Sequence, residues 1–322
     1  MKNNRKFILV FILLGCLLSL LFISTYLYIN DSNNKEKTTK ISVIVYGSNS
    51  DRWATLKQGI DQGALDFGAE INLVTMTDEN STAEQEMLVK REIANGAKGI
   101  IIAAVDSKEM TKVISDASII VPIVMVETNV DDNAGLVFIS ADNYSMGLNI
   151  GRSVLLNSDE NKTVAIYKKN LQRGSVNERY KGLMDSLQYT EYTINPWEMG
   201  EEDTDSALFL QKMLKEESID IIVAMDDRSL EEVVDAVETT ESTVEIYGIG
   251  STNKIVHYLD YGVINSIVFQ NEFNMGYLSI QEVVNDICEN KSVLDIDIEF
   301  RTVNKETMYL PKNQRLVFPI VQ

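Results

Sequence analysis

From Ile41 onward, short β-branched apolar runs alternate with amphipathic stretches. This alternation constrains the fold most, because strands that take turns with helices form parallel sheets covered on both faces. The predicted strands are Ile41–Tyr46, Ile71–Met76, Gly99–Ala104, Ile123–Glu127, Leu136–Ser140, Thr163–Tyr167, Ile219–Met225, Val244–Ile249 and Val263–Phe269. Roughly 280 residues is long for one doubly wound sheet, so the sequence predicts an α/β fold of two lobes.

The residues before this region have a different character. Phe7–Ile29 contains 23 residues and no charge, and Lys2, Arg5 and Lys6 precede it. A bilayer core needs about 20 apolar helical residues, and flanking positive charge stays on the cytoplasmic side. We therefore predict one N-terminal transmembrane helix within residues 1–29, a polar tether at 30–40, and a main domain on the extracytoplasmic side of a bacterial cell membrane.

Two alternatives to an uncleaved anchor stay open. Leu13-Leu14-Gly15-Cys16 resembles a bacterial lipobox, in which the cysteine is lipidated and becomes the new N-terminus. A cleaved signal peptide is the other alternative, although its apolar core is normally shorter. The sequence does not distinguish a lipidation site at Cys16 from an anchor, but all three readings place the main domain outside the cytoplasm.

The net charge of −19 also divides along the chain. Residues 1–40 carry six basic and two acidic side chains, and the remainder carries 23 basic and 46 acidic ones. An acidic main domain repels phosphates, which argues against binding nucleic acid or an anionic lipid surface. One histidine and two cysteines are too few for a zinc cluster, and no catalytic or dinucleotide motif is present. We therefore expect no enzyme activity, metal or cofactor.

Polar or aromatic residues follow most of the predicted strands. In doubly wound sheets, ligands bind in the crevice beyond the carboxyl ends of the strands. The residues at these positions include Ser48–Trp53, Glu127-Thr128, Asp226-Asp227 and Gln270-Asn271. Such a lining suits a polar, neutral small molecule such as a sugar.

The order of several segments resembles a known family. The segments are ISVIVYGSNSDRWATLKQGIDQGALDFGAE, REIANGAKGIIIAAVD, VPIVMVET, ISADNYSMGLNIG, NERYKGLMDSL, IDIIVAMDDRSLEEVVDAV, VEIYGIGS and GVINSIVFQNEFNMG. They are similar to the periplasmic sugar-binding proteins of the ribose/galactose type, which are ABC transporter substrate-binding proteins with the periplasmic binding protein-like I fold. The similarity runs from about residue 41 to about residue 303.

The resemblance implies a first lobe of residues 41–142 plus 271–297 and a second of 143–270 plus 298–322. It places the hinge near Asp142, Gln270 and Asp297. It also implies ligand-binding residues at matching positions, and these are Asn49, Ser50, Trp53, Glu127, Arg179, Asp226 and Gln270.

The match is incomplete at three places. Arg52 stands where a second aromatic residue is usual, Thr128 replaces an arginine, and Gly250 replaces an aspartate. Arg52 suggests an acidic or phosphorylated ligand as an alternative to a simple sugar. Trp53 also fits the apolar stripe of the following helix, so core packing is a second reading of that residue.

The function implied is an extracytoplasmic solute-binding protein. It would bind a sugar or sugar-like molecule in an interlobe cleft and present the closed form to an ABC permease. The alternative is a membrane-tethered ligand sensor that signals through a membrane sensor histidine kinase. In either role, a ligand closes the lobes only by binding the closed form more tightly.

Overall fold

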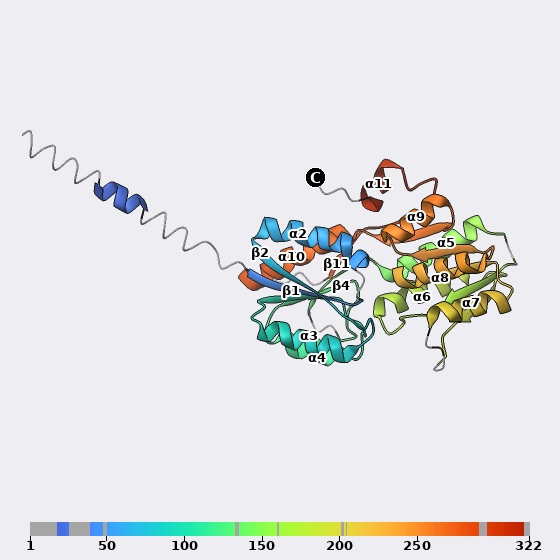
Figure 1. Cartoon of the computed structure of the whole chain (residues 1–322), viewed down its shortest axis with the longest axis horizontal. Helices are drawn as coiled ribbons and strands as arrows, with labels where there is room; N and C mark the ends of the chain where they lie inside the picture. The colour runs from blue at the N-terminus through green and yellow to red at the C-terminus, as the bar shows by residue number, and fades with distance from the viewer. Residues whose placement is uncertain are drawn as a thin grey trace, which may run out of the picture. The chain divides into compact units, whose positions relative to one another are not determined.

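The computed structural model describes residues 18–25, 39–47, 50–132, 135–159, 161–200, 203, 205–289 and 295–318. Residues 18–25 are helical, and the rest of the predicted anchor, Phe7–Ile29, lies outside the described residues. In the described part of the chain, no helix has both the length and the apolar composition needed to cross a membrane. Residues 40–322 form one compact unit (Figure 1).

Two six-stranded sheets organise this unit. The strands of the first sheet, in spatial order, are β11 (Asp295–Asp297), β5 (Val137–Ser140), β4 (Ile123–Val126), β3 (Gly99–Ile102), β1 (Thr39–Val45) and β2 (Ala69–Thr75). Those of the second are β12 (Phe300–Val303), β10 (Ser266–Gln270), β9 (Glu245–Ile249), β8 (Ile221–Ala224), β6 (Thr163–Tyr167) and β7 (Thr193–Trp197). Their shared order 2-1-3-4-5 is that of a doubly wound sheet. The predicted α/β fold with two sheets is confirmed.

The strand pairs are almost all parallel. In the first sheet β1–β3, β3–β4, β4–β5 and β5–β11 pair in parallel. In the second, β6–β7, β6–β8, β8–β9 and β9–β10 do so, whereas the β10–β12 pair is antiparallel.

Helices cover both faces of each sheet. The helical segments are η1 (Ser50–Trp53), α2 (Ala54–Phe67), α3 (Thr82–Ala94), α4 (Thr111–Ser118), α5 (Asn143–Asn157), α6 (Gly174–Leu187), α7 (Ser206–Glu216), α8 (Asp227–Thr240), α9 (Asn253–Tyr261), α10 (Glu272–Glu289) and α11 (Pro311–Val317). We call the first sheet with α2–α4 and α10 the first lobe, and the second sheet with α5–α9 the second lobe. Figure 1 shows α2 and α10 on one face of the first sheet and α3 and α4 on the other.

The alternation of side chains along a strand explains this double cover. Successive side chains point to opposite faces of a sheet. In β6, Val164 and Ile166 join an apolar cluster that includes residues of α5 and α6, whereas Ala165 and Tyr167 join a second cluster with residues of α7, α8 and α9. All four are buried, so β6 is apolar throughout.

The chain passes between the sheets three times, after β5, β10 and β11. The crossings are hydrogen-bonded to one another. The backbone N–H of Ala141 donates to Oε1 of Gln270 at 3.3 Å, and that of Asn271 donates to the carbonyl of Glu299 at 2.9 Å. Three linked connections between the lobes permit relative rotation while keeping the strand ends of both sheets near each other.

Candidate functional site

Charged side chains follow four strands at the carboxyl ends of the two sheets. Arg52 comes after β1, Glu127 directly after β4, Asp227 at the start of α8 and Glu272 at the start of α10. The crevice at strand ends is where doubly wound sheets bind ligands. The fold thus brings together residues that are as many as 220 positions apart in the chain.

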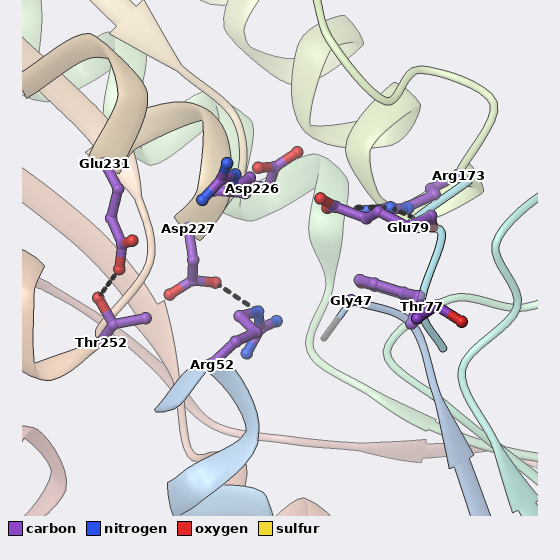
Figure 2. A pocket seen from close by; sticks show the side chains of 11 residues that line it. Gly47, Arg52, Thr77, Glu79, Arg173, Asp226, Asp227, Glu231 and Thr252 are labelled. Atoms are coloured by element: carbon purple, nitrogen blue, oxygen red, sulfur yellow. Dashed lines mark hydrogen bonds and ion pairs between the residues drawn. The ribbon is translucent and has the colours of Figure 1, made fainter. Parts of the chain in front are cut away.

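A cavity of about 190 Å³ lies beside these residues. Its lining comes from both lobes and includes Tyr46, Arg52 and Thr77 from the first, and Arg173, Asp227 and Thr252 from the second. Figure 2 shows Arg52 and Asp227 pointing toward each other and joined by their ion pair, with Arg173 and Glu79 on the other side of the pocket. The cavity is small and most of its lining residues are polar or charged, which suits a small molecule with hydroxyl groups and an apolar face.

Arg52 is the centre of the charge cluster. Its Nη2 donates to both carboxylate oxygens of Glu127 at 2.7 and 2.8 Å, and its Nη1 donates to Glu272 at 2.6 Å. Its Nε lies 3.0 Å from Oδ2 of Asp227. Burial by itself would lower the pKa of Arg52, but Asp227, Glu127 and Glu272 raise it well above its ordinary value.

Glu127 links both lobes from a strained backbone position. It has a φ of 58°, which is rare for a residue other than glycine and is often found at functional sites. Its side chain also accepts from Tyr46 Oη at 3.0 Å and lies 3.5 Å from Nη2 of Arg179. Burial alone would raise the pKa of Glu127, but the charges of Arg52 and Arg179 outweigh it and hold the pKa below its usual value.

Asp226 and Asp227 are adjacent in the chain, but their side chains have different partners. Asp226 caps α8, accepting from the N–H of Ser229 at 2.8 Å and from Nδ2 of Asn170 at 2.9 Å. Asp227 accepts from the N–H of Ser251 at 2.8 Å and pairs with Arg52. Burial tends to raise the pKa of both carboxyl groups. At Asp226 the charge of Arg173, together with the hydrogen bonds that the carboxylate accepts, outweighs burial and leaves the pKa lowered. At Asp227 burial outweighs the charge of Arg52, and the pKa is raised.

Arg173 is a cleft residue that sequence reasoning missed. It directly precedes α6, is 1% exposed, and its guanidinium lies 3.7 Å from the ring centroid of Tyr46 in the other lobe. Its Nη2 donates to Asn80 Oδ1 at 2.8 Å and to the carbonyl of Glu79 at 3.2 Å. Its Nε has no hydrogen-bond partner among the described residues. A buried donor without a partner is costly, so this N–H suits a ligand oxygen in the adjoining cavity.

These residues line a cleft between two lobes, and the sequence of the lobes matches a known family. A model of the periplasmic binding protein domain matches residues 41–291. The chain belongs to the periplasmic binding protein domain family. This confirms the family predicted from the sequence and agrees with the prediction of a binding protein rather than an enzyme. No curated protein sequence matches the chain.

Solved structures share this periplasmic binding protein fold at low identity. A carbohydrate transporter solute binding protein from Agrobacterium radiobacter, in complex with D-arabinose, has a TM-score of 0.80 and 20% identity over 88% of this chain and 100% of that one. The glucose-galactose binding protein GanP from Geobacillus stearothermophilus has a TM-score of 0.74 and 18% identity over 85% and 100%. A Caulobacter myo-inositol binding protein gives 0.75 and 16% over 87% and 98%.

The seven predicted ligand-binding residues of this periplasmic binding protein domain occupy different surroundings. Glu127 and Asp226 lie at the cleft, and Asp226 lines the cavity. Arg179 is buried, and its Nε donates to Asn143 at 2.7 Å while its Nη2 faces Glu127. The side-chain oxygen of Gln270 accepts a hydrogen bond from the backbone N–H of Ala141, in the connection between the lobes that follows β5. Asn49 lies outside the described residues.

The first-lobe loop differs most from expectation. Trp53 is 2% exposed, and its Nε1 donates to the carbonyl of Tyr46 at 2.7 Å. Its ring packs edge-on against Tyr46 and beneath the guanidinium of Arg52, so it lies behind the cavity lining. This geometry favours the core-packing reading of Trp53, and direct stacking on a sugar stays a prediction. Ser50 is the first residue of η1, two positions before Arg52.

Glu272→Gln is expected to change the pH dependence of this domain's stability. Burial, Asp227 and Glu127 raise the pKa of Glu272 to about 7 in spite of the nearby Arg52. Between its ordinary value and about 7, the folded carboxyl keeps a proton that the unfolded one has lost, so this group's contribution to stability falls as pH rises through that range. In urea denaturation, the neutral glutamine should leave the variant about 3 kcal/mol more stable than wild type at pH 8, and the difference should shrink to within about 1 kcal/mol at pH 5. A wild-type advantage at pH 8 would contradict the assignment.

Proposed function

We propose that the chain is an extracytoplasmic solute-binding protein that takes a neutral sugar or sugar-like molecule into the interlobe cavity and presents its closed form to an ABC transporter. The observation that carries this is the cavity lined by polar and charged residues of both lobes, with an Arg173 N–H on its wall that has no partner in the described part of the chain. Carboxylates and guanidinium groups are suitable partners for hydroxyl groups. Two of the structural neighbours are complexes with D-arabinose and with myo-inositol.

The ligand is proposed to be neutral because the cleft's central cation is already engaged. The three kinds of nitrogen in Arg52 each face a different carboxylate. An acidic or phosphorylated ligand would meet Asp226, Asp227 and Glu231 on the same cavity wall. A negative ligand group placed close to these carboxylates would be strongly repelled in a partly desolvated site. This argues against the acidic ligand that Arg52 suggested in the sequence.

The proposed contacts keep the predicted set and extend it. Asn49, Ser50, Trp53 and Glu127 would serve the first lobe, and Arg179, Asp226 and Gln270 the second. Arg173, Asp227 and Thr252 are added because they line the cavity. We propose that the lobes divide at the predicted boundaries, with the hinge at the three crossings where Asp142, Gln270 and Asp297 lie. Rotation there would open the cavity.

We infer that residues 1–29 anchor the protein in a bacterial cell membrane and hold the lobes outside the cytoplasm. The support is the uncharged run Phe7–Ile29 with its preceding positive charges. Lipidation of Cys16 is the competing attachment. Cys16→Ala should remain in the membrane fraction at full length if the run is an anchor, whereas loss of processing or of a lipid label would favour the lipobox.

The partner is proposed to be an ABC permease. The relatives described above include transport proteins and no sensor, so docking on a histidine kinase stays a prediction from the sequence. Crosslinking in intact cells from a cysteine placed on the exposed rim separates the two. Capture of a kinase ectodomain in place of a permease would overturn the transport role while leaving solute binding intact.

A thermal-shift screen tests the proposed function. We expect one or more neutral pentoses, hexoses, inositols or polyols to raise the melting temperature by mass action, and sugar acids and sugar phosphates to have no effect. Arg173→Ala should weaken binding of the active sugar by about 1–3 kcal/mol, since a ligand oxygen loses its buried donor. Arg91→Ala on α3 is the matched control, because that arginine is half-exposed and outside the cleft. Equal affinity in both variants would refute the role of Arg173.

A further inference from the structure

Three buried carboxylates converge on the guanidinium of Arg52, and they come from both lobes. Glu127 follows β4 of the first lobe and is 1% exposed. Asp227 begins α8 of the second lobe and is 4% exposed. Glu272 begins α10, where the chain returns to the first lobe, and is 7% exposed. Arg52 reaches all three from η1, so one side chain joins the lobes across the cleft.

The surroundings of this guanidinium are those of a bound ligand. Nη1 and Nη2 donate hydrogen bonds to Glu272 and Glu127 at 2.6 and 2.7 Å, and Nε lies 3.0 Å from a carboxylate oxygen of Asp227. The indole of Trp53 lies under the flat face, with its ring centroid 4.3 Å from the central carbon. Proteins bind planar cations with carboxylates at the edge of the cation and an aromatic ring against its face.

The carboxylates depend on this cation. Within the described residues, Arg52 is the only basic side chain paired with Asp227 or with Glu272. Glu127 has a second cation in Arg179, but at the longer distance of 3.5 Å. Without Arg52, three carboxyl groups would face one another in a desolvated space without their cation, and the cost of leaving them unpaired there would favour a more open cleft.

We propose that Glu127, Asp227 and Glu272 form a guanidinium site between the lobes, which Arg52 occupies as an internal ligand and through which it holds the cleft closed without solute. This goes beyond the proposed function, because Arg52 would favour closure in the absence of solute, although Arg52 and Asp227 also line the solute cavity. Arg52 then favours the closed form before solute binds, and a bound solute adds to that preference by its own contacts with both lobes. The same carboxylates accept a free guanidinium compound once Arg52 is shortened.

Chemical rescue tests the proposal without any sugar. Arg52→Ala should melt at a lower temperature than wild type and show a larger radius of gyration in small-angle X-ray scattering. Millimolar methylguanidinium should raise the melting temperature of the variant by several degrees and return its radius toward the wild-type value. It should leave wild type and the half-exposed control Arg91→Ala unchanged. Urea, which has the shape without the charge, and tetramethylammonium, which has the charge without N–H donors, should not rescue.

Two results would overturn the proposal. One is ligand-free wild type that scatters as an open form, and the other is Arg52→Ala that stays closed and ignores methylguanidinium. If Arg52→Ala does not fold, Arg52→Lys is the second variant, because it keeps a positive charge but loses the planar arrangement of donors. It should have a larger radius of gyration and a lower melting temperature than wild type. An unchanged radius in that variant counts against the proposal. Because no solute is used, failure of rescue and failure of the sugar screen are separate results.

Discussion

Glu127→Ala is expected to lower the free energy of unfolding by about 3–5 kcal/mol, because it removes the carboxylate shared by two buried arginines. Arg52 would keep Asp227 and Glu272, but Arg179 would lose its only ion pair within the described structure, and the hydroxyl of Tyr46 its acceptor. A buried charge left without its partner is among the few causes of so large a loss. Urea denaturation at pH 7, with the transition midpoint and slope recorded for both proteins, measures the difference.

A matched pair of variants isolates the cause. Glu86→Ala also removes an ion-paired glutamate, but Glu86 and its partner Lys90 are exposed on α3, so the loss should stay within about 0.5 kcal/mol. Glu127→Gly removes the same buried carboxylate while relieving the strain of a φ of 58°. It should therefore be more stable than Glu127→Ala by about 1 kcal/mol. A loss in Glu127→Ala no larger than that in Glu86→Ala would contradict a structural role for the buried charge cluster.

The strands and helices were largely predictable because burial on both faces leaves a plain signal. Runs such as Gly99–Ile102 and Ile123–Val126 are wholly buried and read as continuous apolar segments. The strand β7 was missed: its sequence TINPW contains Pro196, which removes a backbone donor and is tolerated here because β7 is the last strand of its sheet. The short strands β11 and β12 carry too few residues to show a period.

The candidate site was predictable only in part, because its partnerships are long-range. Position after a strand was enough to select Glu127 and Asp226, and both lie at the cleft. Nothing local indicates that Arg52 meets Asp227 and Glu272, since these pairings depend on how two lobes face each other. Arg173 carries no motif of its own; its signal is its position directly before α6, after a strand of the second lobe.

One departure from the family pattern has a structural counterpart. Gly250, in place of the family's aspartate, has a φ of 153° that side chains rarely adopt. A Cβ built there would lie 2.6 Å from Oδ1 of Asp227. The carboxylate of Asp227 therefore occupies the space next to the turn, and it turns toward Arg52. A negative charge therefore lies beside the Gly250 turn, at this end of the cleft.

Gly147→Ala is expected to destabilise the second lobe by an amount near the upper end of about 1–3 kcal/mol, through overpacking between α5 and α6. A Cβ at Gly147 would lie 1.9 Å from the carbonyl oxygen of Arg179 and 2.7 Å from the carbonyl carbon, and both are backbone atoms that no rotamer change can move. The two helices must separate, and Arg179 moves with α6. Its Nη2 is already 3.5 Å from Glu127, so the ion pair across the lobes should be lost as well.

Thermal denaturation of Gly147→Ala beside Gly200→Ala measures this effect. A Cβ at Gly200 would meet only a side-chain oxygen of Asp203, at 3.5 Å, and we expect a change within about 0.5 kcal/mol there. Double-mutant analysis with Arg179→Ala then separates packing from charge. If Gly147→Ala acts partly by withdrawing the guanidinium, the two losses will be less than additive. Full additivity would mean that the helices part without moving Arg179, and the close packing of α5 on α6 would then have no part in positioning this cleft residue.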